Sequence, residues 1–523
     1  MARREGLKAV QMFEAVERGK IKALWVMGTN PAVSLPRANS IGSALKKLEL
    51  FVISENVLSN DTVNAAAHVL LPAAAWGEKD GTVTNSERCI SRQRSFLPLP
   101  AEAKPDWWIV SQIACQLGFS DAFSYASAAD IFREHAALSC FENGGTRAFD
   151  IGGLATVSDV GYAALAPVQW PLRADGSRTA RFFSQGGFFT PDRKARFVTP
   201  EQPALNADLS AEFPLRLNTG RVRDQWHTMT RSGKSVRLAG HRPEPFVEIH
   251  PLDAANYRLK QDGFAEVTTP HGRCILKVVI DAGQRPGCIF VPIHWSKEKA
   301  ASARVNDLVA AATDPHSGQP EAKATPASIA PVQFAYAAFA LTRHSILFPP
   351  HTWWARIPYP DATGYLLASN DRPMRWHELT PRLFGKDAVL TQYLDQERGI
   401  YRVAAFHAGR FEGGLFLAPA DAHSPWSAMS LFERGALSGT MSHLPTQSAA
   451  LPDGGEMLVC ACFGVGLKAI RKALVSPRIA DVEGIGRALR AGTRCGSCLP
   501  ELRSIVANRE RQVPLVHGST VPP

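Results

Sequence analysis

Residues 21–28, IKALWVMG, and residues 50–56, LFVISEN, are two short apolar runs that decide the fold class of the amino-terminal part of the chain. Each is typical of a buried strand, and each follows a segment with helical apolar spacing, over residues 5–18 and 41–48. Alternating helices and strands predict half of a doubly wound α/β domain. We expect its ligand-binding edge at the loops that follow the strands, beginning with GTNP at residues 28–31.

Downstream of these runs the pattern becomes less regular. Residues 68–74, HVLLPAA, predict another short strand, and residues 105–118, PDWWIVSQIACQLG, predict a helix. Between them, residues 77–88, GEKDGTVTNSER, indicate a polar loop. Residues 122–203 are rich in glycine and aromatic pairs and indicate no chemistry, and residues 200–212 are typical of a linker.

The next region is a series of short alternating or β-branched runs broken by glycine and proline, which predicts a small β-barrel. The runs are LRLNTG at 215–220, PFVEIHP at 245–251, GFAEVTTPHGRCILKVVI at 263–280 and GCIFVPIHW at 287–295. Residues 313–332, with their prolines, form the expected closing segment. Beyond it lies a mixed segment that includes a predicted helix over 427–437, SAMSLFERGAL, and no catalytic signature.

Composition restricts the function classes. The chain has 523 residues, enough for three or four domains, and its 45% apolar and 20% charged residues are those of a globular protein. The formal net charge of +10 is not concentrated in any Lys/Arg run, so nucleic acid is not the expected partner, and small anionic ligands or acidic redox partners are. No stretch is apolar enough for a membrane span or an export signal, and we expect a cytoplasmic protein without a membrane partner.

Four of the nine cysteines are clustered near the carboxyl end, in CACFGVGLKAI at 460–470 and LRAGTRCGSCLPEL at 489–502. The pairs Cys460/Cys462 and Cys495/Cys498 can supply four thiolates to a [2Fe–2S] cluster, since iron prefers soft sulfur ligands. A zinc ribbon is the alternative, although the one-residue gap between Cys460 and Cys462 is unusual for it. Positive charge from Lys468, Arg471 and Arg494 would raise the reduction potential of a cluster held there.

Several longer stretches are similar to a known family. They are ALWVMGTNPAVSLP (23–36), AHVLLPAAAWGEKDGTVTNSERCISRQR (67–94), EAKPDWWIV (102–110), LNTGRVRDQWHTMTRSG (217–233) and DPHSGQPEAKATP (314–326). Over residues 1–332 the chain resembles the C-terminal part of a molybdopterin-dependent assimilatory nitrate reductase catalytic subunit. The four-cysteine region resembles the bacterioferritin-associated-ferredoxin-like (BFD-like) [2Fe–2S] domain found at the end of such reductases.

The resemblance implies an α/β multidomain protein. We expect a partial doubly wound α/β molybdopterin oxidoreductase domain over 1–200 and a six-stranded β-barrel that binds the molybdopterin dinucleotide over 213–332. A mixed segment of unknown role follows over 334–452, and a small helical BFD-like [2Fe–2S] domain over 455–510. The implied cofactors are molybdenum bis(molybdopterin guanine dinucleotide) and [2Fe–2S].

The family's cofactor contacts match particular residues of this sequence. Pyrophosphate and guanine groups need N–H donors, a cation and carboxylates. For one dinucleotide the matching positions are Asn30, Ser54, Glu55, Lys79 and Asp106, where Glu55 replaces the more usual Asp. For the other they are Thr219, Gly220, Arg221, Val222, Arg223, Asp224, Gln225, Trp226, His227 and Thr228, with Asn306 and Lys323 as further contacts. Ile293, His294 and Trp295 fall near the family's substrate channel but match it poorly. Taken singly, each residue could instead cap a turn or be a solvated loop charge.

The family's Cys-rich [4Fe–4S] segment and its molybdenum-ligating residue have no counterpart here, so no catalytic residue is predicted and [4Fe–4S] is expected only in an N-terminal part. The implied activity is molybdenum-dependent reduction of nitrate to nitrite, with electrons entering through the terminal [2Fe–2S] cluster. A flavoprotein, an NADH-reductase subunit or a ferredoxin is the expected donor, and an N-terminal half encoded separately is a further expected partner. The alternatives are an electron-transfer or assembly module, or an inactive remnant, without autonomous catalysis.

Overall fold

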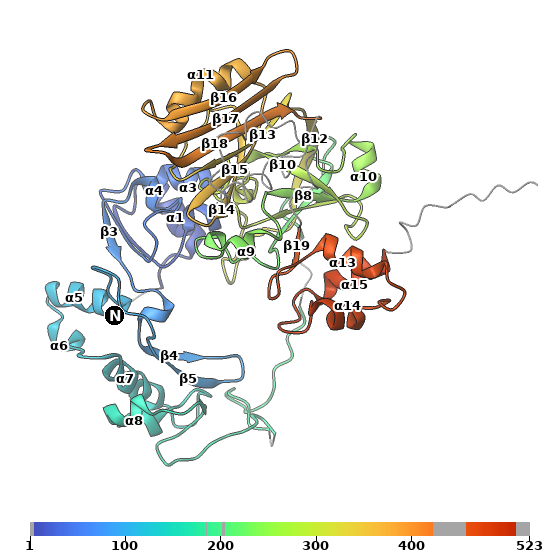
Figure 1. Cartoon of the computed structure of the whole chain (residues 1–523). Helices are drawn as coiled ribbons and strands as arrows, with labels where there is room; N and C mark the ends of the chain where they lie inside the picture. Colours follow the sequence, from blue (N-terminus) through green and yellow to red (C-terminus); the bar gives the residue numbers. More distant parts are fainter. Residues whose placement is uncertain (1–4, 185, 201–203, 422–456, 509–523) are drawn as a thin grey trace, which may run out of the picture.

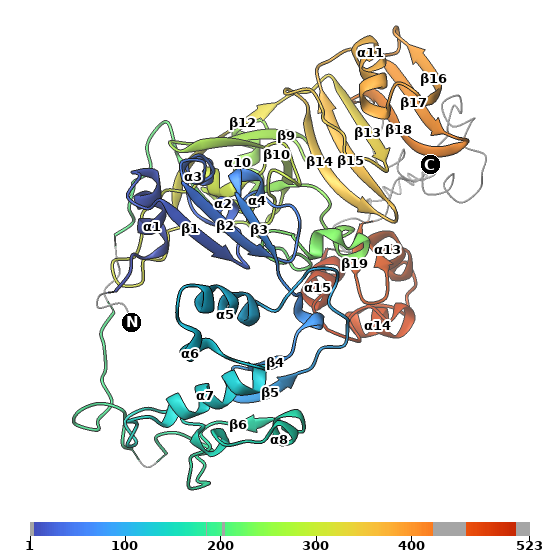
Figure 2. The same ribbon diagram turned by 90° about the vertical axis from the view of Figure 1, so that its left-hand side faces the viewer.

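The computed structural model describes residues 5–184, 186–200, 204–421 and 457–508. Its centre is a closed β-barrel, and the amino-terminal sheet packs beside it. Figure 1 and Figure 2 show a six-stranded sheet at one end of the molecule and a small lobe with α7 (Ala128–Cys140) and α8 (Asp159–Ala163) at the opposite end. The terminal helical domain lies beside α9 (Val236–Ala239). No described helix has the length and apolar content that a bilayer span requires.

The amino-terminal unit is a parallel sheet of order β1-β2-β3 with helices packed against it. As the apolar spacing predicts, Phe13 and Val16 of α1 are buried against Leu45 of α3 and against Phe51 and Ile53 of β2. The elements are α1 (Ala9–Glu17), β1 (Ala23–Met27), α2 (Pro31–Ser34), α3 (Ala38–Leu45), β2 (Leu50–Glu55), α4 (Val63–Ala66) and β3 (Val69–Pro72). The α/β prediction for this unit is confirmed.

The following lobe differs from the expectation of a polar loop. Residues 81–84 form β4, which pairs antiparallel with β5, so the prediction of a loop over 77–88 is wrong for these four residues. The predicted helix over 105–118 is present as α5, and the irregular region contains one long helix, α7, capped by Ser127 and Asp130. The elements are η1 (Trp76–Glu78), β4 (Gly81–Thr84), β5 (Cys89–Gln93), α5 (Asp106–Gln116), α6 (Ser120–Phe123), α7 (Ala128–Cys140), η2 (Gly152–Leu154), α8 (Asp159–Ala163) and β6 (Val168–Gln169).

The predicted barrel is confirmed as a closed six-stranded barrel of order β10-β8-β11-β7-β12-β9. Alternate residues of its strands point inward and are fully buried, among them Leu217, Val267, Leu276 and Ile289. The expected closing segment supplies the sixth strand, β12, which pairs with β7 and β9. The elements are β7 (Leu215–Gly220), η3 (Ser232–Lys234), α9 (Val236–Ala239), β8 (Phe246–Ile249), α10 (Pro251–Asn256), β9 (Phe264–Thr269), β10 (Gly272–Ile280), β11 (Cys288–Pro292), η4 (Val305–Asp307) and β12 (Thr325–Val332).

The described part of the mixed segment is a six-stranded antiparallel sheet of order β14-β15-β13-β18-β17-β16. One face shares a hydrophobic core with the barrel through Phe339 and Trp353, and the other face packs on α11 around Trp376 and Tyr401. The elements are β13 (Tyr336–Thr342), β14 (Trp353–Tyr359), β15 (Ala362–Ser369), α11 (Pro373–Phe384), β16 (Val389–Asp395), β17 (Ile400–His407) and β18 (Arg410–Pro419). The helix predicted over 427–437 lies outside the described residues.

The terminal domain is small and helical. A short β19-β20 hairpin and three helices surround a core that includes Val459, Ile470, Ile485 and Leu502. The elements are β19 (Leu458–Cys460), β20 (Val465–Gly466), α13 (Leu467–Leu474), α14 (Val482–Leu489) and α15 (Leu499–Ala507). The hairpin carries the first cysteine pair, and the turn before α15 carries the second.

Candidate functional site

Asn30 lies in the loop between β1 and α2, at the carboxyl edge of the parallel sheet. It is 6% exposed, and its Oδ1 accepts hydrogen bonds from Thr62 Oγ1 at 2.6 Å and Thr62 N at 3.2 Å. Its Nδ2 is buried and has no hydrogen-bond partner among the described residues. A buried donor without a partner costs roughly 1–3 kcal/mol. The Asn30 amide is therefore placed to donate to a bound group.

Ser54, in β2, stabilises the same carboxyl edge of the parallel sheet. It is fully buried, its Oγ accepts a hydrogen bond from Trp25 Nε1 at 2.9 Å, and its carbonyl accepts one from Gly28 N at 2.9 Å. These contacts join the ends of β1 and β2. They hold in place the two loops that carry Asn30 and Glu55.

Glu55, Lys79 and Asp106 come together from three separate segments, as the sequence predicts for one site. Lys79 Nζ lies 2.8 Å from Asp106 Oδ2, and Asp106 is the first residue of α5. Burial raises the pKa of Glu55, and the nearby Asp106 carboxylate raises it further. Within the described residues, the Glu55 carboxylate accepts hydrogen bonds only from its own loop: from Asn56 N at 2.9 Å, from Asn60 Nδ2 at 3.5 Å and from the Asn56 side-chain amide at 2.8 Å. A partly buried carboxylate with these few partners is suited to accept from the N–H edge of a ligand.

Arg231, in the loop after β7, is a member of this site that the sequence did not single out. With the Asn56 amide oriented to satisfy both neighbours, Asn56 donates to Glu55 Oε1 at 2.8 Å and accepts from Arg231 Nη2 at 2.8 Å. The Arg231 charge also lowers the pKa of Glu55, against the larger effect of burial. The only signal for Arg231 was its position at the end of the matching stretch 217–233. The site thus lies between the α/β unit and the barrel.

Thr219, Gly220 and Lys323 form the base of the loop that follows β7. Thr219 Oγ1 donates to the carbonyl of Ala322 at 2.7 Å, and Lys323 Nζ donates to the carbonyl of Thr219. A Cβ at Gly220 would lie 2.8 Å from the Phe290 ring, so a side chain there requires the ring to move. These residues bring β7 and the segment before β12 together, and in this structure the Lys323 ammonium has a backbone partner.

The tip of the loop presents Arg221, Trp226 and His227. The Arg221 guanidinium lies 5.3 Å from the centre of the Trp226 ring, which is 61% exposed. Burial lowers the pKa of His227, and the Arg221 charge lowers it further, so the imidazole is neutral near pH 7. A flat exposed cation–π pair beside a neutral imidazole is suited to a heteroaromatic ligand.

His294 is hydrogen-bonded to the backbone of this loop. It is fully buried; Val222 N donates to its Nε2 at 2.9 Å, and its Nδ1 lies 2.6 Å from the carbonyl of His227. Because Nε2 accepts, the proton belongs on Nδ1, which donates to His227. Burial lowers the pKa of His294, in keeping with a neutral ring. The sequence placed His294 near a substrate channel, whereas its contacts are to the loop backbone.

Gln225 and Thr228 are buried within the loop. Gln225 Oε1 accepts from Ser232 Oγ at 2.8 Å, and Ser232 Oγ accepts from Trp226 N at 2.9 Å. These bonds give the loop its own internal support, so both side chains face the protein.

Arg223 and Asp224, predicted as dinucleotide contacts, have protein partners instead. Arg223 donates to Asp224 Oδ2, to Glu501 Oε2 and to the carbonyl of Val459. Asp224 Oδ2 also lies 3.2 Å from His241 Nδ1. The middle of the predicted loop thus faces the terminal domain.

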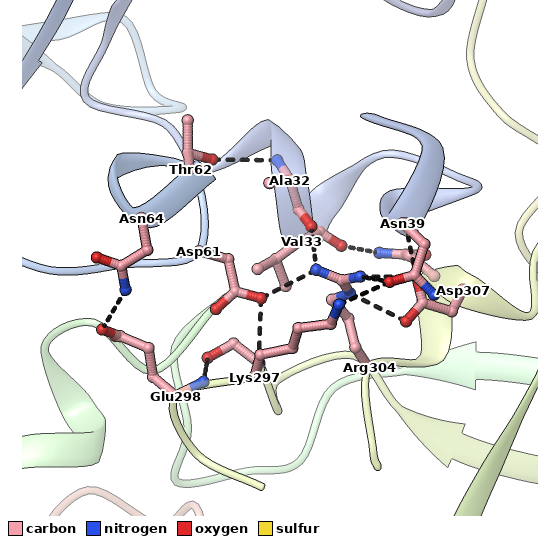
Figure 3. Close-up of polar contacts among 12 residues, drawn as sticks. Ala32, Val33, Asn39, Asp61, Thr62, Asn64, Lys297, Glu298, Arg304 and Asp307 are labelled. Atoms are coloured by element: carbon pink, nitrogen blue, oxygen red, sulfur yellow. Dashed lines mark hydrogen bonds and ion pairs between the residues drawn. The ribbon is translucent and has the colours of Figure 1, made fainter. Parts of the chain in front are cut away.

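Asn306, also a predicted cofactor contact, joins the barrel to the α/β unit. It is 8% exposed, and its Nδ2 donates to the carbonyl of Val33 at 2.6 Å. Figure 3 shows the network around Arg304, which contacts Asp61, Asp307 and the backbone of Ala32. The buried Arg304 therefore joins the barrel to the α/β unit at the same interface that contains Asn30.

The four clustered cysteines lie close together. Cys462 Sγ lies 3.2 Å from Cys495 Sγ, and Cys460 and Cys498 are both buried. Burial and the neighbouring Cys460 raise the pKa of the Cys498 thiol to about 11. A Ser497 hydroxyl 3.1 Å from Cys495 Sγ lowers the pKa of that thiol to about 7.

The four thiols fit a [2Fe–2S] cluster. Such a cluster takes two thiolates on each iron, and Cys460, Cys462, Cys495 and Cys498 are the soft sulfur ligands that iron prefers. The donor set therefore fits [2Fe–2S].

The polar groups between the α/β unit and the barrel fit a dinucleotide. Asn30 offers an unused buried donor, Glu55 a half-buried acceptor, and Lys79 and Arg231 cations for a pyrophosphate.

Three family models match the chain in the order of these sites. "Molybdopterin oxidoreductase" matches residues 1–116, "Molydopterin dinucleotide binding domain" residues 215–326, and "BFD-like [2Fe-2S] binding domain" residues 458–508. The chain therefore contains a molybdopterin oxidoreductase domain, a molybdopterin dinucleotide-binding domain and a BFD-like [2Fe–2S] domain, as the sequence predicted.

Among curated proteins, the chain is similar to nitrate reductases. It is 41% identical to that of Klebsiella oxytoca over 98% of this chain and 58% of the relative. It is 39% identical to that of Shewanella frigidimarina over 66% of this chain and 39% of the relative. It is 36% identical to the assimilatory nitrate reductase catalytic subunit of Bacillus subtilis over 63% of this chain and 45% of the relative. The chain thus spans about half the length of these relatives.

Proposed function

We propose that this chain supplies the dinucleotide-binding and cluster-binding parts of a molybdenum-dependent nitrate reductase, which converts nitrate to nitrite. The observation that carries the proposal is the convergence of Glu55, Lys79, Asp106 and Arg231 from four segments beside the unused amide of Asn30. The similarity to a nitrate reductase along nearly the whole chain supports the choice of substrate.

The reaction consumes one nitrate, two electrons and two protons and yields nitrite and water. Bound molybdenum bis(molybdopterin guanine dinucleotide) supplies the two-electron oxygen-transfer chemistry, while the protein supplies binding, orientation and electrostatics. The diffuse net charge of +10 attracts anions such as nitrate to the protein.

The residues of the site have separate tasks in this proposal. Asn30 Nδ2 donates to one dinucleotide, Glu55 accepts from its guanine N–H edge, and Asp106 fixes the Lys79 ammonium beside the pyrophosphate. Arg221, Trp226 and His227 bind the second cofactor half. His294 keeps Val222 and His227 in the orientation that this requires.

The terminal domain is the proposed entry point for electrons. Cys460, Cys462, Cys495 and Cys498 hold the [2Fe–2S] cluster, and Cys495 is exposed at the domain surface where a donor can approach. A flavoprotein, an NADH-reductase subunit or a ferredoxin is the proposed donor.

The test uses the full chain produced in a host that makes the molybdenum cofactor, alone and together with the part of the Klebsiella oxytoca relative outside the aligned region. Molybdenum, iron and acid-released guanine nucleotide are measured, and nitrite formation is followed with reduced methyl viologen. We expect guanine nucleotide and iron on the chain and nitrite formation in the combined sample.

Matched cysteine variants separate the two cofactors. Cys495→Ser should lose iron while keeping guanine nucleotide, whereas Cys115→Ser, which changes a thiol outside the quartet, should keep both. A chain without guanine nucleotide contradicts the dinucleotide assignment. A combined sample that is loaded with cofactor and forms no nitrite contradicts nitrate as the substrate.

A further inference from the structure

The terminal domain rests on the barrel through a small polar surface, here called the docking interface. Arg223 is its centre: Nη1 donates to Glu501 Oε2 at 2.8 Å, Nη2 donates to the carbonyl of Val459 at 2.7 Å, and Nε and Nη2 donate to Asp224 Oδ2 at 3.1 and 2.7 Å. The remaining members are Gly240, His241 and Leu458.

The other contacts of the docking interface complete a compact network. His241 lies between two carboxylates, with Nδ1 3.2 Å from Asp224 Oδ2 and Nε2 3.2 Å from Glu501 Oε2. Its buried Nδ1 has no hydrogen-bond partner among the described residues, so Arg223 makes the directed bonds to Asp224. The Leu458 N–H donates to the carbonyl of Gly240 at 3.1 Å, which joins β19 directly to the end of α9.

Arg223 also faces the proposed cluster ligands. Val459 directly precedes Cys460, and Glu501 lies in the first turn of α15, which follows Cys498. The Arg223 charge acts on the Cys498 thiol. The Arg223 side chain is only 17% exposed, so solvent and salt screen its charge weakly.

A [2Fe–2S] cluster on four thiolates is anionic, and reduction adds one more negative charge. A nearby cation stabilises the reduced form more than the oxidised form and raises the reduction potential, whereas a carboxylate does the opposite. Arg223 and Glu501 therefore act on the cluster with opposite sign, although they form one ion pair.

We propose that Arg223 of the barrel is a positioning residue of the iron–sulfur centre, which fixes the terminal domain on the barrel and places a cation beside Cys460 and Cys498. The reduction potential of the cluster then depends on a residue of the dinucleotide-binding domain. This inference rests on the proposed [2Fe–2S] ligand set.

The experiment compares the full iron-loaded chain with its Arg223→Gln, Arg223→Lys and Glu501→Gln variants. The midpoint potential is measured by redox titration of the electron paramagnetic resonance signal of the reduced cluster. For Arg223→Gln we expect, at a fixed potential, about a tenfold fall in the ratio of reduced to oxidised cluster, or about 59 mV for a one-electron couple. Arg223→Lys should stay near the parent because the charge remains, and Glu501→Gln should shift in the opposite direction.

The matched control is Arg273→Gln, because Arg273 is 76% exposed and pairs with Glu266 within the barrel. It should leave the potential unchanged. Docking is measured separately by hydrogen exchange of the peptide that contains Leu458, which should be faster in Arg223→Gln and unchanged in Arg273→Gln.

The proposal is overturned if Arg223→Gln keeps the parent potential, or if it shifts in the same direction as Glu501→Gln. Should Arg223→Gln fail to fold, Arg223→Lys and Glu501→Gln decide the matter: a Glu501→Gln potential equal to or below that of the parent contradicts the proposal. An iron-free parent chain contradicts the ligand set itself, whereas a loaded parent whose potential ignores Arg223 contradicts only the positioning role.

Discussion

The two polar atoms of the Asn30 side chain have different roles, one structural and one proposed for cofactor binding. Its Oδ1 supports Thr62, while its Nδ2 is buried and unused by the described residues. Asn30→Asp keeps the acceptor, removes the donor and places a negative charge beside the proposed pyrophosphate. We expect a loss of bound guanine nucleotide of about tenfold or more, measured after acid release. The exposed Asn64→Asp is the control, and a variant with parental nucleotide content contradicts the role.

The half-buried Lys299 predicts how the stability of the protein depends on pH. Burial lowers its pKa from 10.5 to about 8, and the charges of Arg356 and Lys234 act in the same direction. The unfolded chain therefore holds more protons than the folded chain between pH 8 and 10.5, so this residue makes stability rise with pH across that window. Lys299→Met should raise the free energy of unfolding by about 1–3 kcal/mol at pH 7 and by little at pH 10.5. Urea unfolding at the two values measures this, and an equal gain at both would refute the assignment.

Residues of the site could be predicted from the sequence where their position relative to a strand or helix places them at the edge of the sheet. Asn30 follows β1, Glu55 ends β2, Lys79 follows η1 and Asp106 begins α5, and the fold brings their segments together. Arg223 was predicted as a cofactor contact because a linear motif does not show which domain a loop faces. Its partner Glu501 is 278 positions away.

At the scale of elements, apolar alternation predicted the barrel strands because one face of each is buried in a closed core. The same criterion failed for β4, a four-residue strand whose residues are only half-buried or exposed. The strand β12 was predicted only as a closing segment because its prolines indicate breaks. Its place in the barrel depends on pairing with β7 and β9, which no local pattern encodes.

Strand β18 gives a test of close packing. A Cβ at Gly413 would lie 2.6 Å from the Leu341 carbonyl oxygen and 2.8 Å from the Phe384 ring of α11. Gly413→Ala should therefore destabilise the protein by about 1–3 kcal/mol, since the backbone cannot move cheaply. The matched control is Gly42→Ala in α3, where a Cβ meets nothing within 4 Å and should stabilise by roughly 0.5–1 kcal/mol. Chemical unfolding measures both, and equal signs would contradict the packing argument.

At the scale of the whole molecule, Arg304 ties the barrel to the α/β unit (Figure 3). Its side chain is 4% exposed and pairs with Asp61 at 3.0 Å and Asp307 at 2.9 Å. Arg304→Met leaves both carboxylates without their cation and should cost about 3–5 kcal/mol. The double variant Arg304→Met/Asp61→Asn should recover part of this loss.

The control for this prediction is Arg375→Met, which breaks an ion pair with Glu378 whose partners are both 56% exposed. It should change stability by less than about 1 kcal/mol. Denaturant titrations of the three variants decide the question. A loss in Arg304→Met no larger than that in Arg375→Met would mean that the buried network does not hold the two units together.

The docking interface also sets an order of events during synthesis. Glu501 leaves the ribosome 278 residues after Arg223, which at ~5–20 residues per second is roughly 15–55 s later. During that interval Arg223 of the nascent barrel has its neighbour Asp224 as a partner but does not yet have Glu501. The chain can therefore complete this contact only after residue 501 has been synthesised, and iron delivered to Cys495 and Cys498 arrives at a barrel that has already been made.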